Sequence, residues 1–210
     1  MSTPNAHLSE FYERHHAAAR NHGAFVFVPE RIPFFKRALG APGKRILDLG
    51  CRSGAVAQHF LEGNEVVGLD VDRVALEEAE KLGIETVVAD VEATLPFPDK
   101  SFDAVIAGEL LEHVRFPEEV VADARRLLRP GGIFVGSVPN MFNLHNRLAF
   151  LRGQRPDPDP THLHMLSPEA VSTLLEPFDD VHMEFFGGRF IRLHRRLLSW
   201  DIAFRGLRRP

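Results

Sequence analysis

The stretch RILDLGCRSGAVAQHF, Arg45 to Phe60, decides the fold of this 210-residue chain. It opens with an apolar run of the kind that forms a buried strand. Two glycines follow, Gly50 and Gly54, and apolar residues then recur at helical spacing, which predicts a helix over 55–61. A strand that turns this tightly into a helix is the first half of a βαβ unit.

The same alternation of strand and helix patterns continues to Val138. A helix is predicted after Asp72, its N-cap, and another over 117–128, where Pro117 suits the first turn and PGG at 130–132 stops the helix. The first of these helices is expected to bury one face, made by Val74, Ala75, Ala79 and Leu82. The later strands are predicted in EVVGLD (65–70), IETVVA (84–89), FDAVIA (102–107) and IFVGSV (133–138). Strands that are apolar throughout are covered on both faces, so the fold class is α/β, Rossmann-like and doubly wound, with a mostly parallel sheet.

The flanking segments differ from this core. Two helices are predicted before Lys44, over 6–20 and 29–39. After Pro139 come a proline-rich loop, RGQRPDPDPTH, and a helix capped by Ser167 with Val171, Leu174 and Leu175 on one face. A further strand is predicted in VHMEFF (181–186). We interpret 1–210 as one domain with a helical lid (1–43), a core (44–138) and a cap on the substrate side (139–210).

Composition narrows the class of protein. The chain is 44% hydrophobic and 26% charged, which is ordinary for a soluble globular domain. Its net charge of -4 disfavours nucleic acid as the main partner. No run is long and apolar enough for a transmembrane segment, and the first residues lack the layout of a signal peptide. Cys51 is the only cysteine, so no internal disulfide can form, and we expect a cytoplasmic protein.

Two acidic residues mark the edge of the sheet where a ligand would lie. Ligands of open parallel sheets bind beyond the carboxyl ends of the strands. Asp70 ends the second predicted strand, where a carboxylate can accept hydrogen bonds from ribose hydroxyls, and Asp90 follows the third. Each acid alone is equally well explained as a turn residue, but together with the glycine turn they predict a nucleoside pocket. The turn reads GCRSG, so it has neither the dinucleotide pattern GxGxxG nor the lysine of a P-loop.

At this point the sequence resembles the class I S-adenosylmethionine-dependent methyltransferases. The resemblance rests on LDLGCRSG (47–54), GLDVD (68–72), ADVEATLPFPDKSFDAVIAGELLEHV (89–114) and LLRPGGIFVGSVPN (127–140). The segment from NLHNRLAFLRGQ to THLHMLSPEAVSTLLE is similar to a subgroup that includes ubiquinone-type and sugar or natural-product O-methyltransferases. The resemblance implies a seven-stranded sheet whose last strand, DIAFRGL, is antiparallel, with S-adenosyl-L-methionine as cofactor. It also implies methyl transfer to a small-molecule acceptor, most simply at a hydroxyl. An N- or C-directed methyltransferase and a non-catalytic protein that binds the cofactor are the alternatives.

The resemblance also implies roles for particular residues. The methionine part of the cofactor would lie against 48–54, the ribose and adenine against 70–71 and 90–91, and the sulfonium near 107–109. The residues implied are Asp48, Gly50, Cys51, Gly54, Asp70, Val71, Asp90, Val91, Ala107 and Glu109. Arg52 departs from the family, which has glycine there. Its side chain would point outward, pair with the cofactor's carboxylate, or crowd the cofactor.

A hydroxyl acceptor must lose a proton, and histidine is the commonest base at neutral pH. We expect that base to be His113, in LEHV after the fourth strand, or His164, after the proline-rich loop. His162 and His164 form a His-x-His pair, but two ligands without a third are weak evidence for a metal, so no metal site is predicted. His15, His16 and Tyr12 are expected on the lid.

The C-terminal tail, GGRFIRLHRRLLSWDIAFRGLRRP, is rich in arginine and carries apolar residues between the arginines. One interpretation is a basic amphipathic segment in peripheral contact with an anionic membrane, which would suit a lipid-linked acceptor. A grip on a phosphorylated acceptor is the second interpretation. A packed helix and edge strand with solvated arginines is the third. The oligomeric state is left open.

Overall fold

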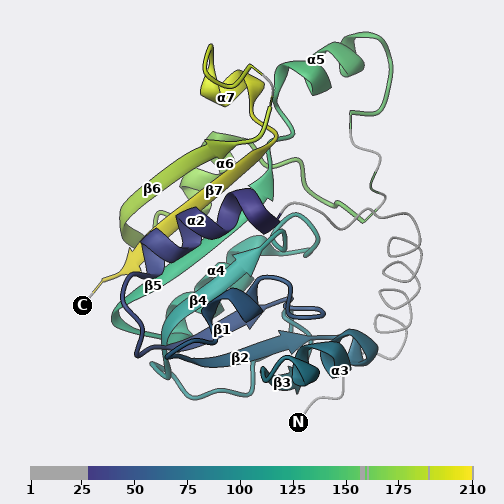
Figure 1. Cartoon of the computed structure of the whole chain (residues 1–210). Helices are drawn as coiled ribbons and strands as arrows, with labels where there is room; N and C mark the ends of the chain where they lie inside the picture. The colour runs from purple at the N-terminus through teal and green to yellow at the C-terminus, as the bar shows by residue number, and fades with distance from the viewer. Residues whose placement is uncertain (1–27, 157–158, 160, 189, 210) are drawn as a thin grey trace.

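The computed structural model describes residues 28–156, 159, 161–188 and 190–209 (Figure 1). The predicted helix over 6–20, most of the lid and the lid residues His15, His16 and Tyr12 lie outside these ranges. The helices are α2 (Val28–Leu39), the 3-10 helix η1 (Ala57–Phe60), α3 (Arg73–Lys81), α4 (Pro117–Leu127), α5 (Leu144–Leu151), α6 (Pro168–Leu174) and α7 (Arg195–Leu198). The strands are β1 (Arg45–Leu49), β2 (Glu65–Asp70), β3 (Glu85–Val88), β4 (Phe102–Gly108), β5 (Leu128–Pro139), β6 (Phe178–Phe186) and β7 (Asp201–Arg208).

The strands form one seven-stranded sheet in the order β3-β2-β1-β4-β5-β7-β6. Strands β1 to β5 are parallel to one another, and β7 runs antiparallel to both β5 and β6. The expected antiparallel last strand is therefore confirmed. Because the chain proceeds from β1 to β3 in one direction and continues at β4 on the other side of β1, the strand order reverses between β1 and β4.

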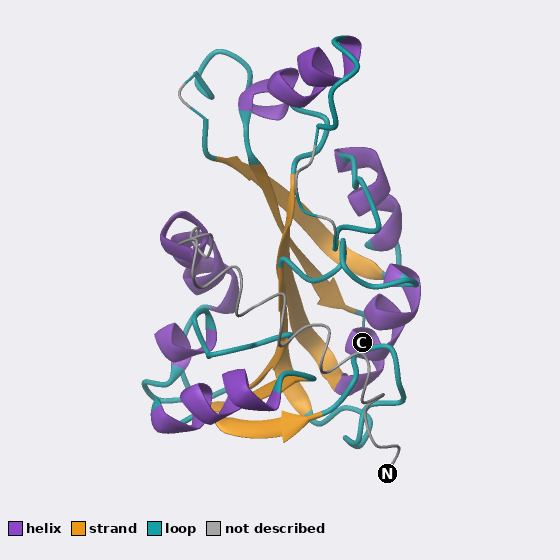
Figure 2. Ribbon diagram, turned by 90° about the vertical axis from the view of Figure 1, so that its right-hand side faces the viewer, coloured by secondary structure: helices purple, strands orange, loops and turns teal. Residues whose placement is uncertain are grey.

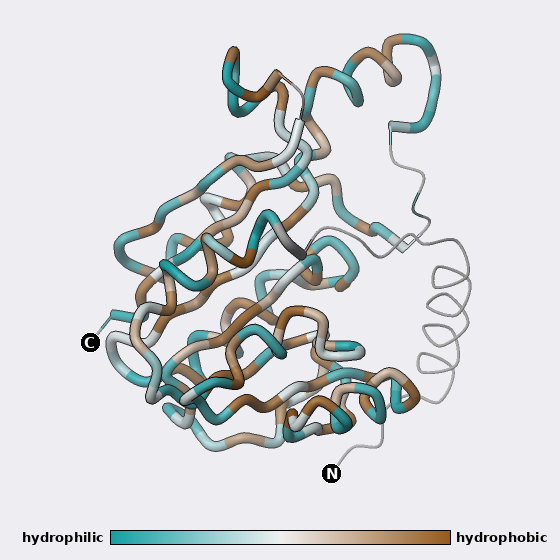
Figure 3. The backbone as a smooth tube through the Cα atoms, in the orientation of Figure 1, coloured by the Kyte–Doolittle hydropathy of each residue, from teal (hydrophilic) through white to brown (hydrophobic). Residues whose placement is uncertain are grey.

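Helices cover both faces of the sheet, as Figure 2 shows. On one face, the side chains of β1, β2, β4 and β5 pack with α4 and α6, through residues such as Val121 and Val171. On the other face they pack with α2, η1 and α3, through residues such as Phe35, Phe60 and Ala79. The central strands are hydrophobic along most of their length (Figure 3), as expected when neither face meets water. The doubly wound α/β class is confirmed.

Two predictions about the helices of the first half were wrong in detail. Residues 55–61 form only the short 3-10 helix η1, because the chain must return within a few residues to begin β2 at Glu65 beside β1. In α3 the buried residues are Ala75, Leu76 and Ala79, while Val74 and Leu82 are exposed. The buried face of α3 is therefore rotated by about one residue from the predicted face. The cap by Asp72 determines where the helix begins but not which face packs against the sheet.

The second half contains one helix that the sequence did not predict. Asn143 caps α5 by accepting a hydrogen bond from the Asn146 amide at 2.9 Å. Ser167 caps α6 in the same way, as predicted, through the Ala170 amide. Strand β5 begins at Leu128, directly after α4, and a register shift opposite 102–104 accommodates the PGG segment. The division into lid, core and cap stays an interpretation.

No helix in the described ranges is long and apolar enough to cross a membrane.

Candidate active site

The turn after β1 requires the left-handed backbone conformation at three positions. The φ angles are +69° at Gly50, +51° at Arg52 and +79° at Gly54. The amides of Gly50 and Cys51 both donate to the Leu69 carbonyl, at 2.8 and 3.0 Å, so the turn is fastened to β2. Glycine adopts this conformation without a steric penalty, whereas a side chain makes it costly. The left-handed backbone conformation of this turn therefore explains why glycine occupies positions 50 and 54.

Arg52 takes the conformation that glycine would take, and its amide has a defined partner. The Arg52 N–H donates to Oδ2 of Asp70 at 3.0 Å. The main chain at this position thus helps to hold the carboxylate at the end of β2. The arginine does not prevent the turn from forming.

Replacing Arg52 by glycine is expected to raise the free energy of unfolding by about 0.5–1 kcal/mol, because it removes the penalty of a left-handed non-glycine residue. Thermal melting measures the change. The matched control is Ser53→Gly, one residue along, where φ is not positive and glycine only adds freedom to the unfolded chain. A loss of stability in Arg52→Gly similar to that in Ser53→Gly would contradict the assignment of strain.

Asp70 is buried at the carboxyl end of β2 and is held by two amides. Its Oδ1 accepts from the Asp72 amide at 2.8 Å, in addition to the bond from Arg52. Burial raises its pKa, and the hydrogen bonds from the two amides act in the opposite direction. A carboxylate offers about four lone-pair directions, so acceptor capacity remains after two backbone bonds.

Asp90 lies at the same edge, beyond β3. The Ala89 amide donates to the Asp70 carbonyl at 3.0 Å, so the chain stays beside the end of β2 up to the residue before Asp90. The side chain of Asp90 accepts from the Glu92 amide at 2.9 Å, which is a turn-forming role. Asp90 and Val91 are half-buried. The structure brings Asp70 and Asp90 to one edge of the sheet. The side chain of Asp90 also stabilises the turn that follows β3.

Asp48 lies inside β1, paired in register with Gly68 and Ile106. It is 2% exposed, and its Oδ2 has no hydrogen-bond partner among the described residues. Burial, reinforced by the nearby Asp70, raises its pKa to about 8. Such an uncompensated carboxyl favours a cationic or hydrogen-donating ligand. The neighbouring Cys51 thiol is buried toward Gly68, so Cys51 would meet a ligand mainly through its backbone.

The end of β4 carries an ion cluster that the sequence did not predict. Nη2 of Arg31, from α2, lies 3.2 Å from Glu109 Oε2 and 3.1 Å from Asp201 Oδ2, at the start of β7. Burial raises the pKa of Glu109 to about 7, while Arg31 works against that rise. The other oxygen of Glu109, Oε1, is buried without a hydrogen-bond partner among the described residues. Ala107 is fully buried, backbone included, so the structure does not expose it to a ligand.

A second cluster joins the end of the β4 loop to the segment after the proline-rich loop. The Thr161 hydroxyl donates to Asp159 at 2.6 Å and lies 3.0 Å from Nδ1 of His113. With the hydroxyl hydrogen directed to Asp159, this arrangement favours the His113 tautomer that carries its hydrogen on Nδ1, and Nε2 lies 3.9 Å from Oε1 of Glu112. His164 lies apart from this contact, with Nε2 at 3.3 Å from the Arg115 carbonyl.

Glu112 lies behind His113 and is 1% exposed. Burial and the neighbouring Glu109 raise its pKa well above the ordinary range. One ligand atom each from Glu112, His113 and His162 lies within 4.8 Å of the others, so these groups could hold a metal ion. Of the His-x-His pair only His162 belongs to this group, and the other two members come from a separate segment that the fold brings near.

A methyltransferase domain model matches residues 47–136. The ubiquinone biosynthesis O-methyltransferase of Chromobacterium violaceum is 36% identical over 114 residues, 50% of this chain and 48% of that protein. A probable S-adenosylmethionine-dependent methyltransferase of Mycolicibacterium smegmatis is 32% identical over 155 residues, 72% of this chain and 58% of that protein. The chain thus spans about half of the length of the curated relatives it matches.

Solved structures show the same fold at low sequence identity. A SAM-dependent methyltransferase from Thermotoga maritima superposes with a TM-score of 0.73 at 17% identity, covering 97% of this chain and 99% of the other. One from Archaeoglobus fulgidus gives 0.70 at 22% identity, covering 85% and 91%. The domain match over residues 47–136, the similar relatives and the shared fold agree, and together they support a class I S-adenosylmethionine-dependent methyltransferase domain in this part of the chain.

Proposed function

We propose that this protein transfers the methyl group of S-adenosylmethionine to a hydroxyl group of a small-molecule acceptor. The observation that carries the proposal is the pair of buried carboxylate oxygens without partners, on Asp48 and Glu109, beside the switch point between β1 and β4. S-adenosylmethionine carries two cationic groups, an ammonium and a sulfonium. In this poorly solvated site, the two positive charges of such a ligand would offset the cost of burying the carboxylates of Asp48 and Glu109.

The remaining proposed cofactor contacts come from residues at the carboxyl ends of the parallel strands, which lie at the same edge of the sheet. Gly50 would let the ligand approach the backbone, since a Cβ there would already meet Leu110 Cδ1 at 3.0 Å. Asp70 would bind the ribose hydroxyls with its remaining acceptor capacity, and Asp90 would bind the adenine amino group. The full proposed set is Asp48, Gly50, Cys51, Gly54, Asp70, Val71, Asp90, Val91, Ala107 and Glu109.

The sulfonium supplies an already activated methyl group, so the chain's own task is to orient the acceptor and take its proton. Holding two reactants in line can lower the barrier by roughly 7–11 kcal/mol. We propose His113 as the base, because the hydrogen bonds that join Asp159, Thr161 and His113 hold the imidazole in place and favour the tautomer with hydrogen on Nδ1. His164 remains the alternative base.

The oxygen-directed reaction is supported by relatives that are named ubiquinone biosynthesis O-methyltransferases. The same proposal includes a lipid-linked or phosphorylated acceptor, peripheral membrane contact by the basic tail, and a cytoplasmic location, which the single buried cysteine suits.

Cofactor binding is tested by calorimetry with S-adenosylmethionine and its demethylated product, S-adenosylhomocysteine. Asp70→Asn is expected to weaken the binding of both by about 1–3 kcal/mol, because a charged acceptor for the ribose is lost. Asp103→Asn is the matched control: Asp103 also accepts a backbone amide, that of Arg45 at 2.8 Å, but at the amino end of the strands. Equal affinities in the two variants would reject the pocket assignment.

Transfer is tested with a labelled methyl donor against phenol, quinol and sugar acceptors. His113→Gln is expected to lower kcat by 10²- to 10⁴-fold, roughly the contribution of a general base, with little change in cofactor affinity. His164→Gln serves as the comparison. Cofactor binding without transfer to any acceptor would favour a non-catalytic protein, and labelled amine or carbon products would favour the other methyltransferase classes.

A further inference from the structure

Two segments of the cap contain no acidic residue. Residues 140–156 carry three arginines and residues 187–200 carry four, on a chain whose net charge is -4. Large apolar side chains are exposed in the same segments: Leu148, Phe150, Leu151, Phe190, Leu193 and Trp200. Phe150 is 70% exposed, Leu151 81% and Leu193 80%. Exposure of so many large apolar groups near one another marks an interaction surface.

These segments lie side by side in the fold. Figures 1 and 2 show α5 and α7 together at the top of the molecule, beyond the end of the sheet. The Asn140 side-chain amide donates to the Arg196 carbonyl at 2.8 Å, and the rings of His145 and Trp200 are 5.6 Å apart. We call the surface made by residues 142–155 and 190–200 the cap face. Hydrophobic and hydrophilic positions alternate along it (Figure 3).

The arginines of the cap face differ from those elsewhere on the molecule. Arg205 and Arg209 on the tail pair with Asp180 and Asp179 at 2.7 and 2.8 Å, as the packed interpretation of that part of the tail expects. Among the described residues, the ion pair found for the cap-face arginines is a loose one, between Arg196 and Glu169 at 3.9 Å. Within the described ranges, the cap face therefore has a local excess of positive charge.

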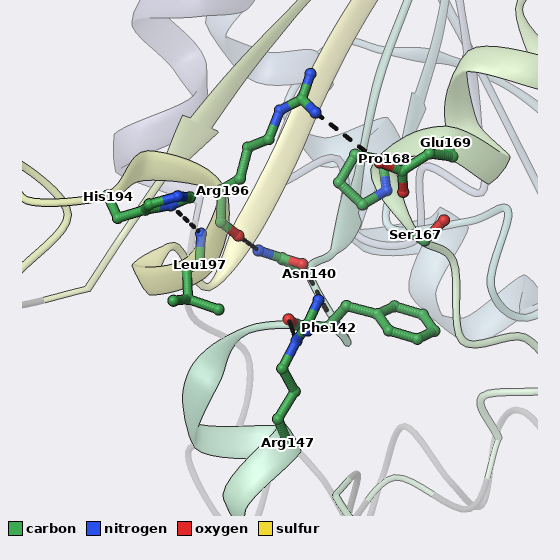
Figure 4. Close-up of a pocket in the computed structure, with 9 residues that line it drawn as sticks. All are labelled: Asn140, Phe142, Arg147, Ser167, Pro168, Glu169, His194, Arg196 and Leu197. Carbon is green, nitrogen blue, oxygen red and sulfur yellow. Dashed lines mark hydrogen bonds and ion pairs between the residues drawn. The ribbon is translucent and has the colours of Figure 1, made fainter.

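A cavity of about 390 Å³ lies at the foot of the cap face, between α5, the start of α6 and α7 (Figure 4). Arg147, Arg196 and His194 contribute basic groups to its lining, and Ser167 a hydroxyl. Glu169 also lines it, 76% exposed at its side chain. The cavity offers cationic donors beside exposed apolar side chains, which suits a phosphate group attached to acyl chains.

We propose that the cap face docks the protein on an anionic phospholipid surface. The exposed phenylalanine, leucine and tryptophan side chains would enter the boundary of the acyl chains while the arginines contact the anionic headgroups. A second copy of the chain fits less well, because like arginines would face one another. Nucleic acid would leave the apolar side chains exposed to water.

The cap face lies at the same end of the sheet as the candidate active site, so docking there would bring the membrane close to that site. Residue 142, where its first segment begins, lies three residues after the carboxyl end of β5, the same edge of the sheet that carries Glu109 and Asp70. A lipid-dissolved acceptor would then leave the bilayer close to the candidate active site; this link, unlike the docking itself, rests on the proposed function.

The test is sedimentation with vesicles of phosphatidylcholine alone and of phosphatidylcholine with 30% phosphatidylglycerol. Wild-type protein is expected to bind the anionic vesicles at least tenfold more tightly, and high salt should weaken that binding. The double variant Phe150→Ser/Leu151→Ser and the charge variant Arg152→Glu/Arg195→Glu should each lose at least tenfold. The control Val74→Ser/Leu82→Ser removes two apolar side chains exposed on α3 and should bind as wild type.

Thermal melting and S-adenosylhomocysteine binding show whether each variant is folded, and they report on the cofactor site independently of the docking. Absence of binding by the wild type, or equal binding by the cap-face variants and the α3 control, would overturn the proposal. So would analytical ultracentrifugation that shows a dimer which the cap-face variants abolish, since the face would then be occupied by a second copy.

Discussion

Arg31→Met is expected to lower the free energy of unfolding by about 3 kcal/mol, the lower end for a buried ion pair, because it leaves the buried Asp201 and the partly buried Glu109, 28% exposed at its side chain, without their shared cation. Arg31 is only 7% exposed, so water cannot replace the guanidinium. Burial already raises the pKa of both carboxyls, and removing Arg31 would raise it further. Urea unfolding at neutral pH measures the loss.

The matched control is Arg37→Met on the same helix. Arg37 pairs with Glu184 at 2.9 Å, but its side chain is 59% exposed, so the pair contributes at most about 1 kcal/mol. The loss in Arg31→Met should also shrink as the pH falls, because protonation of Glu109 and Asp201 removes the unpaired charges. Similar losses in the two variants, or a loss independent of pH, would contradict the buried cluster.

Asp48→Asn is expected to stabilise the ligand-free protein at high pH. The pKa of Asp48 is about 8 in the folded protein and near 3.8 in an exposed carboxyl, so the folded state keeps a proton that the unfolded state loses. Stability therefore falls as the pH rises from about 4 to about 8. At about 1.4 kcal/mol per pH unit, the cost at pH 8 is on the order of 5 kcal/mol.

The asparagine variant should lose this part of the pH dependence, so that its melting temperature exceeds that of the wild type at pH 8 and approaches it at pH 5. Glu77→Gln, exposed on α3, is the control and should change little. Calorimetry on the same samples should show weaker binding of S-adenosylmethionine. A more stable variant with unchanged affinity would show that Asp48 does not contact the cofactor.

The core of the fold was predictable because its signals are local. Apolar runs ending at Leu49 and Asp70, the cap at Asp72, and Pro117 at the start of α4 each act within a few residues of themselves. The face of α3 and the length of η1 were not predictable from such signals. Both depend on where the following strand must begin, which the sheet sets.

The sequence by itself determined the succession of strands along the chain, the glycine turn and the acidic residues at the ends of β2 and β3, because backbone conformation and apolar periodicity depend on neighbouring residues. Only the tertiary structure decided that Arg31 meets Glu109 and Asp201, that Glu112, His113 and His162 converge, and that α5 lies beside α7. These groups come from segments many residues apart. Their charges and burial depend on the packing that brings them together.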